Sequence, residues 1–140
     1  DDVVQIARAR RIDGMIVSNT TLTRPPSLRD RATAREAGGL SGRPLFALST
    51  RMVAETFVRA EGAFPLVGVG GIDSGGAALT KIRAGATLIQ LYSGLIFKGL
   101  GLVDAIKADL VSTLRRTNRA SLTEIVGADA ATITAEPWPV

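Results

Sequence analysis

The chain has 140 residues with no cysteine and no histidine, and its 17 basic and 13 acidic residues give a net charge of +4. This composition excludes disulfides, zinc sites built on cysteine or histidine, and serine–histidine or cysteine–histidine catalysis within the chain. A hydrophobic fraction of 46% is ordinary for a globular domain. We therefore expect one folded globular domain with no metal site.

Helical and strand-like patterns alternate along the chain. Apolar runs bounded by glycine or proline are typical of strands buried on both faces of a sheet. Their alternation with helical patterns predicts βα units and a parallel sheet, so the expected fold class is α/β. In chain order the expected elements are a helix from residue 3, a strand at 14–18, a helix at 49–60, a strand at 64–70, a helix at 75–84, a strand at 87–91 and a helix at 102–116. The expected apolar side of the last helix carries Val103, Ile106, Leu110, Val111 and Leu114.

Two segments lie outside this alternation. Residues 19–48 form a loop, and loops of this length are rare in compact domains unless they are functional. After residue 118 the pattern weakens, although Ser121 and Glu124 have the spacing of a capping box for one short helix. We expect residues 1–118 to form the α/β unit and residues 119–140 to form a C-terminal tail.

The basic residues are scattered along the chain. A nucleic-acid-binding surface usually concentrates basic charge in one patch with interleaved aromatic side chains, and this sequence has only six aromatic residues. We therefore expect no nucleic-acid partner, and we interpret Arg43, Arg51 and Arg83 as solvated. The sequence contains no apolar stretch long enough to span a bilayer and no signal-peptide pattern at its start.

Polar residues and glycines follow each of the three expected strands. Ligands of parallel α/β folds bind at the carboxyl ends of the strands. Glycines there let the backbone approach an anion closely, and free N–H groups bind it, so two neighbouring strand ends of this kind predict a phosphate cup. The residues at these ends are Ser18, Asn19, Thr20 and Thr21, then Gly70 and Gly71 with Asp73 and Ser74 as a helix cap, then Tyr92, Ser93 and Gly94.

Each of these features also has a purely structural interpretation. Asn19 and the threonines after it can form an Asx turn that opens the long loop, and Ser41 with Gly42 can be a loop hinge. Tyr92 can close the top of the core with its hydroxyl in water. A single glycine-rich turn is more often only a tight turn. Two such turns in register, together with a polar first strand end, favour a ligand site.

Five motifs in succession resemble the dihydroorotate dehydrogenase family. They are DGMIVSNTT at 13–21, GGLSGRPL at 38–45, GVGGI at 68–72, KIRAGA at 81–86 and QLYSG at 90–94. Their order and spacing are similar to the family's from about residue 13 to residue 114. The GRPL ending of the second motif is more like the quinone-dependent class 2 enzymes than the soluble class 1 forms.

The resemblance implies the C-terminal part, about three βα units, of a TIM (β/α)8 barrel that binds FMN. Such an enzyme is an oxidoreductase that converts dihydroorotate to orotate in the biosynthesis of pyrimidines (UMP) and passes the electrons to a quinone. By resemblance, Asn19 and Thr20 bind the substrate, dihydroorotate or orotate. The residues that by resemblance contact FMN are Ser18, Ser41, Gly42, Gly70, Gly71, Tyr92 and Ser93.

The resemblance also implies what this chain lacks. The family's catalytic base lies upstream of the matched segment, so we expect no catalytic residue here and no activity of the chain alone. The parent enzyme is expected to be membrane-associated, bound peripherally at the cytoplasmic face. The open sheet edge is expected to pair with the remainder of the barrel or with a second copy. Two alternatives are another FMN-binding or phosphate-binding TIM-barrel oxidoreductase, and a non-catalytic half-barrel fragment.

Overall fold

The part of the chain that the computed structural model describes, residues 2–26, 28–30 and 32–139, is built around a three-stranded parallel sheet. Its strands are β1 (Met15–Val17), β2 (Leu66–Gly68) and β3 (Leu88–Ile89), in the order β1-β2-β3. Met15 is paired with Leu66, and Gly68 is paired with both Val17 and Ile89. The predicted α/β fold with parallel strands is confirmed.

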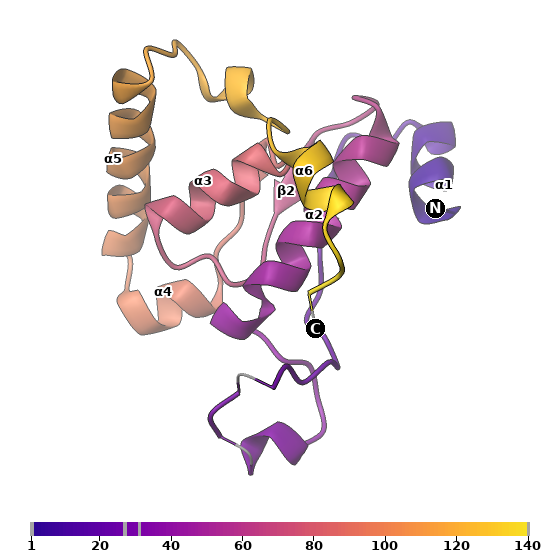
Figure 1. Cartoon of the computed structure of the whole chain (residues 1–140), viewed down its shortest axis with the longest axis vertical. Helices are drawn as coiled ribbons and strands as arrows, with labels where there is room; N and C mark the ends of the chain where they lie inside the picture. The colour runs from indigo at the N-terminus through magenta and orange to yellow at the C-terminus, as the bar shows by residue number, and fades with distance from the viewer. Residues whose placement is uncertain (1, 27, 31, 140) are drawn as a thin grey trace.

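The predicted helices are all present, and two short helices were not predicted. Figure 1 shows α6 lying across α2, and α5 at the far side of α3. The two unpredicted helices, α4 and α6, are too short for a helical period to stand out in the sequence. The helices are α1 (Asp2–Arg10), α2 (Phe46–Ala60), α3 (Gly75–Arg83), α4 (Ser93–Lys98), α5 (Gly101–Arg116) and α6 (Ala130–Ala135), with 3-10 turns η1 (Thr33–Arg35), η2 (Arg43–Leu45) and η3 (Leu122–Ile125).

Helix α2 covers one face of the sheet and buries the main core. Val53 and Ala54 of α2 are completely buried in one apolar cluster with Leu66 of β2 and Ala84 at the end of α3. Burial of side chains of this size contributes about 1–3 kcal/mol each, so this cluster holds α2 firmly against the sheet. The strand ends that carry the polar residues are therefore held by a rigid scaffold.

Helix α5 packs against α3 through a second apolar cluster. Leu102 and Ile106 are buried there, whereas Val103 and Val111 are exposed. The predicted apolar side of this helix is therefore wrong at Val103 and Val111. The contact with α3 is made by Leu102, Ile106 and Leu110, which recur every four residues along one face of the helix, so the predicted side is right at Ile106 and Leu110.

The opposite face of the sheet is uncovered within the described residues. Ile16, Val67 and Leu88 are paired with one another across the three strands, and Ile16 and Leu88 are each 60% exposed. Side chains alternate along a strand, so Val17 and Leu66 point to the helices and are buried. The prediction that the strands are buried on both faces is thus wrong for this chain. An apolar row on the inner face is typical of a strand that lines a barrel.

The two ends of the long loop, residues 19–48, are held together by backbone hydrogen bonds. Thr21 and Leu40 are joined by two backbone hydrogen bonds of 3.2 and 2.7 Å, so the ends of the loop meet. Within it the guanidinium of Arg24 donates to five carbonyl groups, including those of Ala34 and Gly38. The loop forms the lobe at the bottom of Figure 1 and returns the chain to the end of β1.

The segment after α5 is anchored on α2 by a buried arginine. The predicted capping box of Ser121 and Glu124 is confirmed at the start of η3. Further on, Arg51 of α2 is only 6% exposed and donates to the carbonyls of Ile133 and Thr134 in α6, at 2.7 and 2.9 Å. The interpretation of Arg51 as solvated is therefore wrong, because the carbonyl end of α6 replaces water around its guanidinium.

Candidate functional site

The nine residues assigned to a binding site from the sequence all line one cavity of about 320 Å³. The cavity lies at the carboxyl ends of β1, β2 and β3, and Ile16, Gln90 and Leu91 contribute to its wall. A volume of about 300 Å³ is at the lower end for small-molecule sites. The residues brought together are Ser18, Asn19, Thr20, Ser41, Gly42, Gly70, Gly71, Tyr92 and Ser93.

The end of β1 supplies the amide and hydroxyl groups of the site. The side-chain oxygen of Asn19 accepts a hydrogen bond of 2.7 Å from the backbone N–H of Thr20. This is not the Asx turn of the structural interpretation, because the N–H of Thr21, two residues on, donates to the carbonyl of Leu40 instead. The amide NH2 of Asn19 donates to none of the residues that the structure describes, so it remains available to a ligand. Asn19 therefore lines the cavity as an exposed residue whose side-chain oxygen is bonded locally and whose NH2 group has no partner among the described residues.

The end of β2 supplies a turn that only glycine can form. Gly70 and Gly71 have φ angles of +101° and +72°. A Cβ on Gly70 would lie 2.8 Å from Oγ of Ser49, and a Cβ on Gly71 would lie 2.7 Å from the backbone nitrogen of Phe46. The missing side chains thus let the turn lie directly on the first turn of α2. The backbone N–H groups of both glycines donate to no described residue, which suits an anion site.

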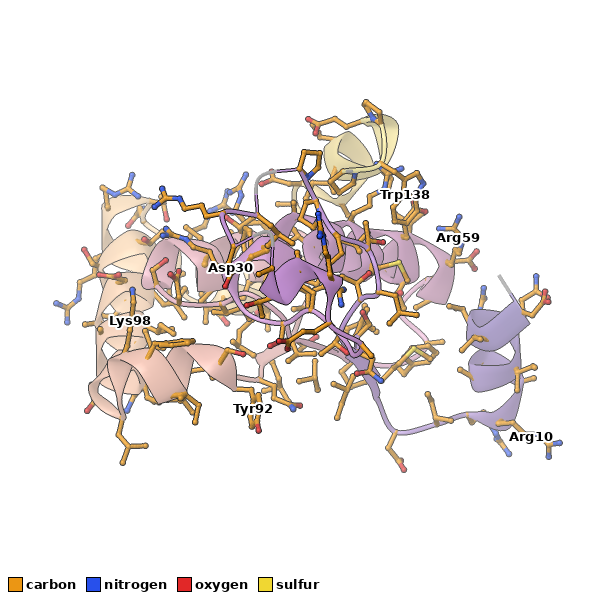
Figure 2. All side chains as sticks on the ribbon, turned by 90° about the horizontal axis from the view of Figure 1, so that it is seen from below. Arg10, Asp30, Arg59, Tyr92, Lys98 and Trp138 are labelled. Atoms are coloured by element: carbon orange, nitrogen blue, oxygen red, sulfur yellow. The ribbon has the colours of Figure 1, made fainter. Side chains whose placement is uncertain are left out.

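The end of β3 meets the returning long loop. The hydroxyl of Ser93 donates to the hydroxyl of Ser41 at 3.3 Å, and a Cβ on Gly42 would lie 3.7 Å from Cβ of Ser93. Tyr92 is 74% exposed, and Figure 2 shows it extending from the ribbon on the side opposite Trp138. The interpretation of Tyr92 as closing the top of the core is therefore wrong. Its ring forms an open wall of the cavity.

An ionic cluster ties the three loops together beside the cavity. Oδ2 of Asp73, just after the glycine turn, lies 3.6 Å from Nε of Arg43 and 3.7 Å from Nζ of Lys98. Nζ of Lys98 also donates to the carbonyl of Asp73 at 2.7 Å. Arg43 remains largely exposed, as predicted, whereas Lys98 is half-exposed. These contacts join the end of the long loop and the end of α4 to the turn after β2.

A buried lysine below the glycine turn was missed from the sequence. Lys81 of α3 is completely buried, and its Nζ donates to Oγ of Ser49 at 2.5 Å and to the carbonyl of Phe46 at 3.4 Å. Its ammonium also lies 5.0 Å from the centre of the Phe46 ring. Burial lowers the pKa of Lys81 to about 7. The signal was present, because Lys81 shares the apolar face of its helix with Ala78 and Ile82.

Burial of the Lys81 ammonium makes the stability of the fold depend on pH. The pKa of Lys81 is about 7 in the folded state and near 10.5 when unfolded, so the unfolded chain holds the extra proton between these values. Stability from this group therefore rises with pH from about 7 to about 10.5. Between pH 7 and pH 9 we expect the free energy of unfolding to increase by about 2 kcal/mol relative to Lys81→Met. Urea unfolding at both pH values measures this difference; a constant difference would contradict it.

Comparison with known proteins places this fold and site in one family. A family model described as dihydroorotate dehydrogenase matches residues 1–114. The chain belongs to the dihydroorotate dehydrogenase family. Curated relatives named dihydroorotate dehydrogenase (quinone), from Bradyrhizobium sp. (strain BTAi1) and Rhodopseudomonas palustris (strain HaA2), are each 80% identical to it over 140 residues. The resemblance read from the five motifs is confirmed.

Solved structures agree with the family assignment. Crystal structures of DHODH from Eimeria tenella, one in complex with ferulenol and one ligand-free, match with a TM-score of 0.85 and 36% sequence identity. They cover 91% of this chain, which corresponds to 34% and 35% of theirs. The chain spans 38% of the length of the two curated relatives. The three parallel strands correspond to the C-terminal portion of the TIM barrel of these relatives, as predicted.

Proposed function

We propose that the full-length protein containing this chain oxidises dihydroorotate to orotate in pyrimidine biosynthesis, with FMN as its cofactor and a quinone as electron acceptor. The observation that supports this most directly is the convergence of nine residues, spread from Ser18 to Ser93, on one cavity in a chain of this family. Membership in the family implies a flavin; its identity as FMN and the role of each residue are part of the proposal.

The residues at the ends of β2 and β3 suit the phosphate of FMN. The turn at Gly70 and Gly71 leaves two backbone N–H groups without a partner among the described residues, and Ser41 and Ser93 bring two hydroxyls together across the same cavity. These donors would hold the phosphate. Ser18, Gly42 and Tyr92 line the same cavity and would contact the rest of the cofactor. When bound, a flavin supplies the acceptor for a hydride.

The end of β1 suits the substrate. The free amide NH2 of Asn19 can donate to a carbonyl or carboxylate of dihydroorotate, and Thr20 adds a hydroxyl at the same edge. Held in this way, the substrate is oriented before reaction, which is worth orders of magnitude in rate. We assign the proton-accepting base to a residue outside this chain, since none of the nine residues is expected to act as one.

The proposed electron acceptor, a quinone, is a molecule that dissolves in membranes. Quinones are apolar, and both curated relatives carry quinone in their names. Within the described residues, no helix is both long and apolar enough to cross a bilayer. From the apolar nature of the acceptor and the family resemblance, we propose that the full-length protein associates peripherally with the cytoplasmic face of the membrane, through residues outside this chain.

The test compares two lengths of the protein in an assay of orotate formation. The full-length protein, purified with its cofactor, is expected to form orotate from dihydroorotate with a quinone analogue as acceptor, and to release FMN on denaturation. The 140-residue chain with added FMN is expected to form none. In the full-length protein, Asn19→Ala should keep its flavin but lose at least about tenfold in turnover.

Each outcome separates one part of the proposal from the others. Orotate formation by the 140-residue chain alone would contradict the placement of the base outside it. A full-length protein that binds no flavin would contradict the cofactor assignment. Unchanged turnover in Asn19→Ala would remove Asn19 from the substrate site. A full-length protein that binds flavin without any turnover would favour the non-catalytic alternative.

A further inference from the structure

The buried lysine of α3 lies directly beneath the proposed phosphate turn. The stem of Lys81 passes under β2, where a Cβ on Gly68 would lie 3.5 Å from Cβ of Lys81. Its Nζ then reaches Oγ of Ser49 at 2.5 Å. The one hydroxyl proton of Ser49 is shared between the carbonyl oxygens of Gly70, at 3.0 Å, and Phe46, at 3.1 Å. A continuous polar chain therefore runs from the ammonium to the first peptide of the turn.

This chain fixes the direction of a peptide group. The bond between Gly70 and Gly71 is trans, and in a planar trans peptide the N–H points opposite to the preceding carbonyl. Ser49 holds the carbonyl of Gly70 toward α2, so the N–H of Gly71 points away from α2. Because glycine resists rotation of its backbone less than any other residue, such a turn needs an external constraint to keep its N–H in one direction.

The charge of Lys81 has no counter-ion in the described structure. The charged residues of α2 that follow Ser49 are Arg51, Glu55 and Arg59, which pair with one another on the side of α6. Neither β2 nor β3 carries a charged residue. Asp73 pairs with Arg43 and Lys98, Asp109 of α5 lies against Gly75 at the start of α3, and Arg83 on its own helix pairs with Asp129. An anion in the cavity would be the first opposite charge near the ammonium.

We propose that Lys81 is a positioning residue for the phosphate turn, which acts through Ser49 to direct the N–H of Gly71 and whose ammonium strengthens binding of a phosphate-bearing ligand. This inference rests on the proposed function, because it takes the ligand's phosphate to lie at Gly70 and Gly71. An opposite charge nearby favours the protonated lysine, so phosphate binding draws a proton onto Lys81. Affinity for a phosphate-bearing flavin then falls as the pH rises above neutrality.

The test measures the dissociation constants of FMN and of riboflavin, which lacks the phosphate, by flavin fluorescence with the full-length apoprotein. Between pH 6.5 and pH 9 we expect the affinity for FMN to fall about fivefold or more, and the affinity for riboflavin to stay constant. The lower limit avoids the second ionisation of the phosphate near pH 6, which acts in the opposite direction. Lys81→Met should bind FMN about fivefold more weakly at pH 6.5 and show no such fall.

Two further variants separate positioning from folding. Ser49→Ala keeps the charge but removes the contact with the Gly70 carbonyl, so FMN binding should weaken at every pH while riboflavin binding is retained. Lys107→Met removes an exposed lysine of α5 and should behave as wild type. A Lys81→Met protein with wild-type FMN affinity and pH profile would overturn the inference. A wild-type apoprotein that binds neither flavin would instead overturn the proposed function.

Discussion

Replacement of Gly71 by alanine in the full-length protein is expected to abolish retention of flavin during purification and to lower the free energy of unfolding by about 2–4 kcal/mol. Gly71 has a φ of +72°, which an L-residue adopts only at a cost. An alanine Cβ would also lie 2.6–2.7 Å from three atoms of Phe46, two of them backbone, which cannot rotate away. The turn must therefore move off α2. Urea unfolding and the ratio of flavin to protein absorbance measure the two effects.

Gly76 provides the matched control, since it lies only five positions further along, in the first turn of α3. Its φ is outside the left-handed region, and a Cβ there would meet nothing within 4 Å. Gly76→Ala should therefore retain flavin fully and gain up to about 1 kcal/mol of stability from better helix propensity. If Gly71→Ala retained flavin as well as Gly76→Ala does, the close approach of the turn to α2 would be irrelevant to the site.

Replacement of Arg51 by methionine is expected to lower the free energy of unfolding by about 3 kcal/mol. The guanidinium donates to three backbone carbonyls of residues 133–136 and to Glu55, and it lies 4.7 Å from the ring centre of Trp138. Methionine fills the space of the stem but removes the hydrogen-bond donors of these half-buried carbonyls. The midpoint of urea denaturation measures the loss, and hydrogen exchange in α6 should accelerate.

Arg116→Met serves as the control for this substitution. Arg116 is exposed in the last turn of α5, and its replacement should change the unfolding free energy by no more than about 0.5 kcal/mol. Equal effects of the two substitutions would show that Arg51 contributes only its charge. Faster exchange throughout the core in Arg51→Met, rather than in α6, would show that the arginine supports α2 itself and not the segment packed on it.

The site could be predicted from the sequence because its residues follow strands. Apolar runs marked the three strands, and parallel strands bring their carboxyl ends to one edge, so Asn19, Gly71 and Ser93 had to converge if the strands paired in order. Their common cavity confirms that convergence. What each residue binds depends on the ligand, and those roles stay predictions.

Contacts between segments that are distant in the chain could not be predicted from the sequence pattern. The sequence around Arg51 is typical of an exposed arginine on a helix. In the structure its guanidinium is covered by residues 133–136, which lie more than 80 positions away in the chain. The apolar runs at Ile16 and Leu88 indicated buried strands, but hydrophobicity does not reveal whether this chain covers both faces of its sheet. Lys81 differs, because its place on the apolar face of α3, with Ala78 and Ile82, is evident from the sequence itself.

The direct contact of the glycine turn with Phe46 has a mechanical consequence. Gly71 has no side chain to separate its backbone from the backbone of Phe46. A displacement of α2 is therefore not absorbed by the repacking of a side chain between them. A displacement of α2 by a fraction of an ångström therefore also displaces the peptide between Gly70 and Gly71. Arg51, little more than one turn further along α2, lies against the ring of Trp138. Substitutions near the C-terminal end of this chain would therefore shift the glycine turn through α2.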